Sequence, residues 1–175
     1  LGSADTDYAD GRGPNAGRCV SVVGSVGGFI QGFTLKDGHS SRTATDGDCA
    51  DVRAGGAYGY ESDMSALTLA DCTFDGCVAT RGAAAFFVAC ERCRFTKCEA
   101  TNNGVVRNST LTGCLVDQNV GNGILGGGVT AYQTTAVRNE PPSGKATLSY
   151  NMNNSYGLVS ALTVSPGGDV GELSS

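Results

Sequence analysis

The sequence is poor in several residue types, and each shortage excludes something. Its 175 residues include no Trp, a single His (His39) and only 17% charged residues. So little charge excludes a disordered polyelectrolyte, and a lone His with no marked nucleophile gives no sign of a catalytic pair. The longest apolar run, at 83–90, is far too short to cross a bilayer as a helix.

The charge balance is acidic. Twelve Lys and Arg face 17 Asp and Glu, which gives a net charge of −5. Such a balance argues against nucleic acid or an anionic membrane as a partner, and we expect no nucleic acid partner and no membrane span. The chain does not begin with Met, and we therefore expect a processed product or a fragment.

Glycine and cysteine, in contrast, are abundant. The 27 glycines indicate many tight turns or close backbone approaches. The even number of cysteines, eight, favours an oxidising compartment. Two N-x-S/T acceptor sequences, at Asn108 and Asn153, agree with it. Together these features predict a secreted, extracellular or cell-surface glycoprotein.

One six-residue phrase occurs twice. CTFDGC at 72–77 and CRFTKC at 93–98 both read C-x-F-x-x-C, with starts 21 residues apart. Relaxed versions at 33–38, 109–114 and 146–151 extend the series and indicate a period of roughly 20 residues. Within each phrase apolar and polar residues alternate, which predicts a short half-buried strand followed by a turn.

Units of this length with short strands are typical of a β-solenoid, in which each coil rises by about 4.8 Å. We expect an all-β fold, a parallel β-helix of about seven coils, rather than a β-sandwich or a local helix over 83–95. The domain organisation is predicted as a polar N-terminal arm or cap at 1–17, the β-helix at 18–165 and a tail at 166–175. The expected core stack is Leu35, Phe74, Phe95, Leu111 and Leu148.

Five segments carry a family resemblance: GGFIQGFTLKDGHS (27–40), RAGGAYGY (53–60), LTLADCTFDGC (67–77), RGAAAFF (81–87) and LGGGVTAY (125–132). They are similar to the right-handed parallel β-helix repeats of secreted and surface proteins, particularly the polymorphic outer-membrane-protein type with its GGA-I and F-x-x-N phrases. The chain places Cys where that family usually has Asn, at 74–77, 95–98 and 111–114. The resemblance covers roughly 27–151 and implies a right-handed coil, but this fold serves adhesins, lyases and structural proteins alike.

The cysteines have two interpretations within such a stack. Equivalent positions in adjacent coils lie about 4.8 Å apart, a spacing that a disulfide accepts. The pairs Cys72–Cys93 and Cys77–Cys98 are therefore either disulfides or free thiols that fill small core positions. The disulfide candidates are those four together with Cys90, Cys114 and the pair Cys19 and Cys49, which we expect to form a loop-closing bridge.

Two metal ions fit parts of the sequence. The spacing of the cysteines at 72, 77, 90 and 93 is close to that of a zinc ribbon, but the series continues to Cys98 and Cys114 as whole repeated strands. Calcium is a weak candidate that we still prefer to zinc, although neither of two D-x-D-x-x-D segments matches an EF-hand and Asp-rich turns are common. We expect no cofactor; the calcium candidates are Asp5, Asp7, Asp10, Asp46, Asp48 and Asp51.

The function expected from these features is structural. Open sheet edges invite end-to-end self-association into a homo-oligomer or filament, as in a fibre, coat or adhesive appendage. One alternative is a carbohydrate-binding, polysaccharide-lyase or glycoside-hydrolase module with a glycan partner; another is a fragment of a larger surface adhesin. No catalytic residue is predicted. For the alternatives, the stacking tyrosines are Tyr58, Tyr60 and Tyr132, and the outward charges are Asp63, Asp71, Asp75, Arg92, Arg94 and Lys97.

Overall fold

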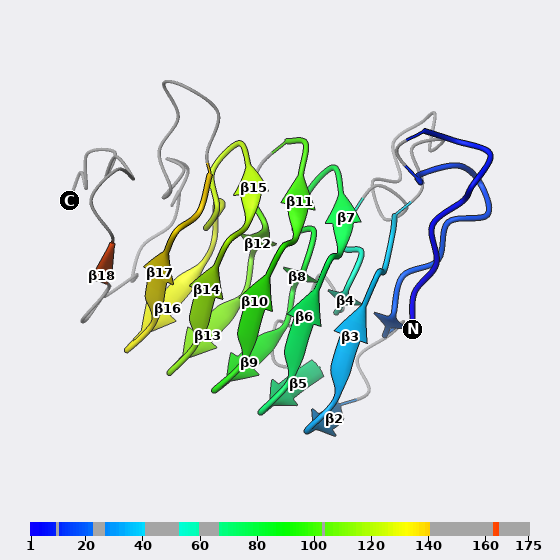
Figure 1. The fold of residues 1–175 in the computed structure, drawn as a ribbon. Coiled ribbons are helices and arrows are strands. Elements are labelled where there is room, and N and C mark those ends of the chain that lie inside the picture. Colours follow the sequence, from blue (N-terminus) through cyan, green and yellow to red (C-terminus); the bar gives the residue numbers. More distant parts are fainter. Residues whose placement is uncertain are drawn as a thin grey trace.

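The structure, a computed structural model, describes residues 1–9, 11–22, 27–40, 53–59, 67–102 and 104–140, together with the backbone of 163–164. Within these residues every regular element is a β-strand, and the strands stack into four parallel sheets (Figure 1). The predicted all-β parallel β-helix is therefore confirmed. The described residues contain no helix long and apolar enough to span a membrane.

Each coil contributes one short strand to successive sheets. Sheet A holds β1 (Val20–Ser21), β4 (Ala57–Tyr58), β8 (Ala85–Phe86) and β12 (Val106–Arg107). Sheet B holds β2 (Gly28–Gln31), β5 (Leu67–Ala70), β9 (Ala89–Glu91), β13 (Thr110–Thr112) and β16 (Thr130–Tyr132). Sheet C holds β3 (Thr34–Lys36), β6 (Thr73–Asp75), β10 (Arg94–Thr96), β14 (Leu115–Asp117), β17 (Thr135–Val137) and β18 (Thr163–Val164). Sheet D holds β7 (Val78–Ala79), β11 (Glu99–Ala100) and β15 (Val120–Gly121).

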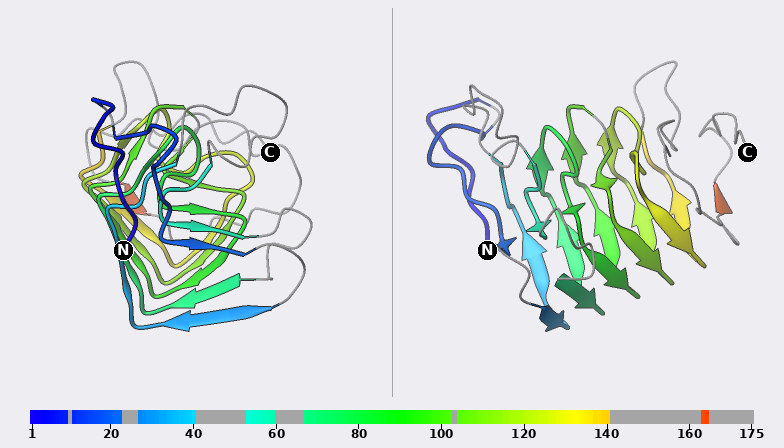
Figure 2. Two further views of the ribbon diagram at one scale, coloured as in Figure 1. Left: turned by 90° about the vertical axis from the view of Figure 1, so that its right-hand side faces the viewer. Right: turned by 180° about the vertical axis from the view of Figure 1, so that it is seen from behind.

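The coils superimpose when the molecule is viewed along the stack (Figure 2, left). In sheet C, Thr73 pairs with Arg94, Arg94 with Leu115 and Leu115 with Thr135, which makes each of these coils 20 or 21 residues long. The segment 83–95 forms strands rather than a helix, as expected, since β8, β9 and the start of β10 occupy it.

The core consists of rows of inward side chains that run along the stack. In sheet C one row continues through five coils, and the rings of Phe74 and Phe95 stack with their centroids 4.7 Å apart. Every other residue of each strand faces this interior because side chains alternate across a strand. The row contains Leu35, Phe74, Phe95, Val116 and Ala136, all buried.

One predicted member of this row lies elsewhere. Leu111 is buried, but it pairs with Cys90 and Ala131 in sheet B, and Val116 takes the place expected for it. The third copy of the C-x-F-x-x-C phrase is therefore CLVDQN at 114–119, rather than the segment at 109–114. Leu148 lies outside the described residues.

The corners of the coil explain how strands of only two to four residues can repeat. A single residue with positive φ ends each strand of sheet B, and another ends each strand of sheet C. This left-handed conformation suits glycine and is tolerated by some polar residues. The first column of corners is Gly32, Asp71, Arg92, Gly113 and Gln133; the second is Asp37, Gly76, Lys97, Gln118 and Arg138.

The N-terminal arm packs against the coils. Ser3 and Gly17 form an antiparallel bridge, and the Gly2 N–H donates to the Lys36 carbonyl oxygen at the edge of sheet C. The side chain of Arg12 is buried, and its guanidinium donates to the Ser40 carbonyl oxygen. Further hydrogen bonds join this guanidinium to the hydroxyl groups of two threonines from successive coils, Thr80 and Thr101. Through Arg12 the arm is fixed to the stack.

Candidate functional site

Free thiols form part of the interior. The seven described cysteines are all unbridged, and six of them are buried. The expected equivalence of the repeated cysteines is present, because Cys72 and Cys93 immediately precede paired strands and Cys77 and Cys98 follow the same strands. The described pairs therefore show the free-thiol arrangement, whereas Cys49 lies outside the described residues and its bridge to Cys19 stays a prediction.

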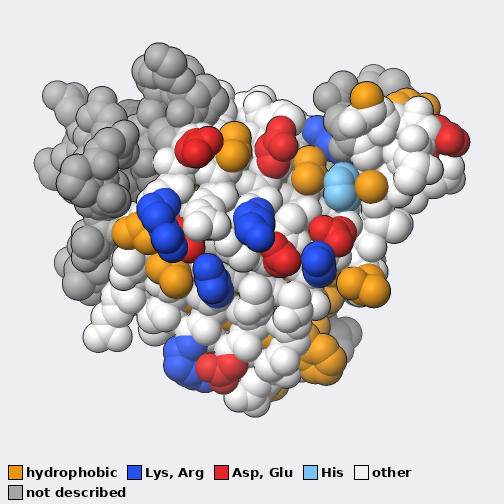
Figure 3. All heavy atoms as spheres, viewed as in Figure 1, with side chains coloured by type: hydrophobic (Ala, Val, Ile, Leu, Met, Phe, Trp, Pro, Cys, Tyr) orange, Lys and Arg blue, Asp and Glu red, His pale blue; other side chains and the backbone are white. Residues whose placement is uncertain are grey.

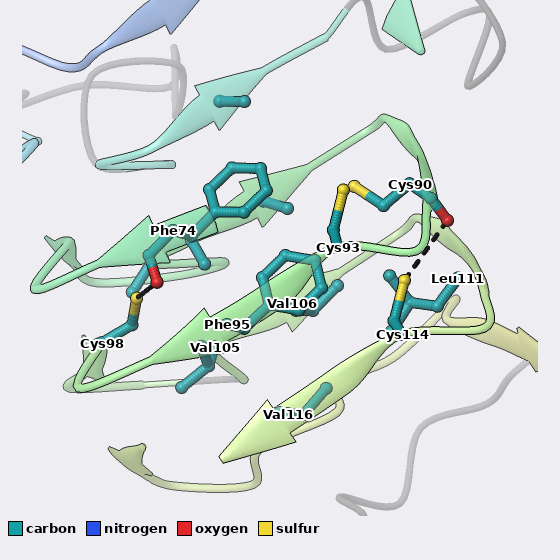
Figure 4. Close-up of a cluster of buried hydrophobic side chains, with 14 of the residues drawn as sticks. Phe74, Cys90, Cys93, Phe95, Cys98, Val105, Val106, Leu111, Cys114 and Val116 are labelled. Carbon is teal, nitrogen blue, oxygen red and sulfur yellow. Dashed lines mark hydrogen bonds between the residues drawn. The ribbon is translucent and has the colours of Figure 1, made fainter. Parts of the chain in front are cut away.

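Three of these thiols meet at the corner between sheets B and C (Figure 4). Cys114 donates to the carbonyl oxygen of Cys90, with an Sγ to O distance of 3.4 Å. Hydrogen bonds from the Cys114 and Cys90 thiols lower the pKa of Cys93. Burial, followed by the contact with Cys93, raises the pKa of Cys90 well above its ordinary value. Negative charge that forms in this cluster is therefore favoured on Cys93.

The zinc-ribbon interpretation does not fit this arrangement. Cys72 and Cys77 stand at opposite ends of β6, and three residues of strand alone span roughly 10 Å. A zinc ion binds each thiolate at about 2.3 Å, which is too short for one ion to reach both ends. Among the described residues, no three or more His, Cys, Asp or Glu side chains are arranged to hold a metal ion.

The described calcium candidates form a turn. Asp5 is buried, and its carboxylate accepts hydrogen bonds from the backbone N–H groups of Asp7 and Asn15, at 3.2 and 2.9 Å. A carboxylate that bonds its own loop in this way stabilises a turn. Asp7 is exposed. The other candidates, Asp10, Asp46, Asp48 and Asp51, lie outside the described residues.

The outward face of sheet C is charged, and acidic groups alternate with basic ones across it (Figure 3). The side chain of Asp117 is completely buried between coils, where Arg138 and Arg94 contact its carboxylate at 2.7 and 3.2 Å. At the neighbouring corner Asp71 receives two hydrogen bonds from Arg92, the shorter 2.7 Å. These acids are neutralised by bases of adjacent coils, an arrangement that stabilises the stack rather than poising a carboxylate for acid–base chemistry.

The structure describes two of the remaining predicted charges, Asp75 and Lys97. Asp75 pairs in register with Thr96 and lies 3.9 Å from the ammonium group of Lys36. Lys97 is exposed at a corner, whereas Asp63 lies outside the described residues. His39 contacts the Asp37 carbonyl oxygen through Nδ1 at 3.0 Å, an arrangement that fits a turn residue.

The predicted tyrosine platform is not formed by Tyr58. Its side chain is only 8% exposed and packs against Phe86 and Phe87, with ring centroids 6.1 and 6.5 Å away. Tyr132 is 37% exposed on sheet B, and Tyr60 lies outside the described residues. The structure therefore does not bring the described tyrosines together as a stacking surface for a sugar.

The two glycosylation candidates stay predictions. Asn108 is partly buried, and its side-chain oxygen lies against Gly128 of the next coil so closely that a Cβ there would be 2.2 Å away. Its neighbour Ser109 is buried, where its hydroxyl donates to the Arg107 carbonyl oxygen and accepts from the Val88 N–H. Asn153 lies outside the described residues.

Sequence reasoning missed a cluster of arginine and aromatic side chains on the outer face of sheet A. Arg53 and Arg107 both stack on the ring of Phe86, with their guanidinium carbons 5.1 and 5.9 Å from its centroid. Arg81 pairs with Arg53 in adjacent coils. A signal for this cluster is present in the parallel segments RAGGAY (53–58) and RGAAAF (81–86), which place Arg five residues before an aromatic ring.

Sequence reasoning also missed the apolar character of the first coil. Phe29 is 64% exposed and Phe33 is 62% exposed, although most large apolar side chains of the described coils are buried. Both lie at the edge formed by β2 and β3. Ile30, on β2, faces the core row of Leu69 but is itself only partly buried.

Comparison of the chain with family models, with curated proteins and with solved structures gives no match. The strand pairing itself is what defines the fold.

Proposed function

We propose that this protein is a structural β-solenoid that self-associates end to end, as a subunit of a fibre, coat or adhesive appendage. The observation that carries the proposal is the edge of β2. Within the described residues sheet B ends at β2 on one side and at β16 on the other, and all its strands run in the same direction. A second copy can therefore continue the sheet without reversing its strands.

The chemistry of this edge favours a second coil as its occupant. In the next three coils the inward residues equivalent to Ile30 are buried between paired strands on both sides, whereas within the described residues Ile30 has a paired strand on one side only. Phe29 and Phe33 add exposed apolar surface at the same edge. An unpaired edge with apolar side chains and no charge is a template for strand addition, which proteins commonly block with lysine.

We further propose an extracellular or cell-surface location and a role without catalysis. The cysteine content and the two acceptor sequences support the location, and the resemblance to the polymorphic outer-membrane-protein type of repeat supports the surface role. The ion pairs of Asp71 and Asp117 with arginines of adjacent coils support a role without catalysis, because these carboxylates are engaged in contacts between coils.

Sedimentation velocity over a wide concentration range, combined with negative-stain electron microscopy, tests the self-association. We expect elongated assemblies whose size grows with concentration. Phe29→Lys places a charge on the exposed edge strand and should shift the population towards monomer. Thr112→Lys is the matched control, because it adds the same charge to an exposed position on the central strand β13 of the same sheet.

A wild-type protein that stays monomeric at every concentration contradicts the proposal. So does an equal loss of assembly in both variants, since that pattern reflects net charge rather than the β2 edge. Assemblies are expected to persist in reductant, because the described thiols are unbridged.

A further inference from the structure

Three successive coils each contribute one arginine to the outer face of sheet A. Arg53 and Arg81 form a parallel bridge, which places their backbones one strand spacing apart, about 4.8 Å. Arg107 belongs to the next coil, where it stands beside Phe86 in the register of sheet A. The three arginines therefore come from adjacent coils, with Arg53 and Arg81 in register and Arg107 in register with Phe86, five residues after Arg81.

The aromatic ring of Phe86 organises this cluster. Gly82, with φ +61°, makes room for the ring, since a Cβ at this position would lie 2.5 Å from it. Arg53 and Arg107 stack on the ring, and Phe86 in turn packs edge-on against Phe87, with centroids 4.7 Å apart. Cation–π contacts with the Phe86 ring therefore hold the guanidinium groups of Arg53 and Arg107 close to each other.

Within the described residues, Arg81 and Arg107 are not neutralised as the arginines of sheet C are. Arg92, Arg94 and Arg138 all pair with aspartates, whereas Arg81 and Arg107 form no ion pair among the described residues. Their Nε atoms are buried without a hydrogen-bond partner in that part of the chain. Burial, followed by the positive charges of Arg81 and Arg53, lowers the pKa of Arg107.

Buried guanidinium donors without a partner, on cations that repel each other, are stabilised by a negative ligand. We propose that Arg81 and Arg107 form a binding site for an oxyanion, namely a sulfate, phosphate or carboxylate group. The planar guanidinium fork matches such groups with paired hydrogen bonds. The groups are supplied either by free inorganic ions or by an anionic polysaccharide lying along the coils. This inference is independent of the proposed self-association.

Thermal unfolding in inorganic sulfate and inorganic phosphate, against chloride at the same ionic strength, tests the site. A ligand that binds only the native state raises the unfolding midpoint increasingly as its concentration exceeds the dissociation constant. We expect sulfate to raise the midpoint of the wild type, and Arg81→Gln and Arg107→Gln each to weaken binding roughly tenfold. Lys97→Gln is the matched control, since Lys97 is an exposed corner residue and Gln118 occupies the equivalent corner of the next coil.

The unliganded variants give a second readout. Removal of Arg81 relieves repulsion between like charges, and Arg81→Gln without anion should therefore unfold at the wild-type midpoint or above it. A clear fall would show that a carboxylate of the chain itself holds Arg81 and would overturn the proposal. No response of the wild type to sulfate, or an equal loss of response in Lys97→Gln, would overturn it as well.

A chemical measurement avoids dependence on variants. Modification of arginine by a dicarbonyl reagent, followed by peptide mapping, should be slowed by sulfate at Arg81 and Arg107 but not at Arg92. Unchanged modification at Arg81 and Arg107 would contradict the site. A sulfated polysaccharide and a polyuronate tested in parallel distinguish the sources. If a polymer protects the arginines at a far lower concentration of anionic groups than inorganic sulfate does, the ligand is an anionic polymer. If the polymer and the inorganic ion are equally potent per anionic group, the ligand is a free ion.

Discussion

Replacement of Asn119 by alanine should be among the most destabilising single changes in this chain. Asn119 is completely buried after β14, at the position that Cys77 and Cys98 hold in earlier coils. Its side-chain oxygen accepts from the Cys98 N–H at 2.9 Å, and its amide donates to the Phe95 carbonyl oxygen at 2.9 Å. Alanine removes both of these hydrogen bonds to buried backbone groups, and each loss costs about 1–3 kcal/mol. The expected loss is therefore about 2–6 kcal/mol.

Two further variants give this prediction its control. Asn119→Cys should lose about half as much, because a thiol at this position can donate to the Phe95 carbonyl oxygen. In the preceding coil Cys98 donates in the same way to the Phe74 carbonyl oxygen, with a longer Sγ to O distance of 3.8 Å. Asn102→Ala, at an exposed position, should change stability by less than about 0.5 kcal/mol.

Urea unfolding followed by far-UV circular dichroism measures these differences, since the chain has no Trp to report by fluorescence. A loss below about 1 kcal/mol for Asn119→Ala would refute the reasoning. So would equal losses for the alanine and cysteine variants, because the backbone partners of Asn119 would then not determine its contribution.

Two other predictions concern the thiols and the ion pairs. The six buried cysteines should resist alkylation in the native protein and react fully in denaturant without reductant; mass spectrometry that finds them still unreacted would show that they are bridged. Hydrogen bonds from Arg92 and then Gln31 lower the pKa of Asp71 to about 2, and an NMR titration should show this pKa return towards 3.8 in Arg92→Gln. Because the folded pKa is depressed, the stabilisation from this pair is present above about pH 4 and is lost as the pH falls towards 2. An Asp71 pKa that does not respond to Arg92→Gln would contradict the pairing.

The repeat of C-x-F-x-x-C was sufficient to predict the class of fold. Two nearly identical phrases 21 residues apart can both bury their Phe and Cys only if one lies on the other, and Phe74 and Phe95 do so. The same reasoning failed for the segment at 109–114. Alternation of apolar and polar residues is the same in every sheet of the coil, and the pattern alone does not say to which sheet a strand belongs.

The sequence by itself determined the repeat, the alternation within each strand and the apolar rows that make an all-β stack favourable. The tertiary structure alone decided which strands share a sheet, because the segments that join them differ in length from coil to coil. It also decided which charges meet. The segments RAGGAY (53–58) and RGAAAF (81–86) relate Arg53 to Arg81, but no local pattern marks Arg107 as a member of the same cluster. Stacking brings Arg53 and Arg107 to the ring of Phe86 because each coil returns to the same face.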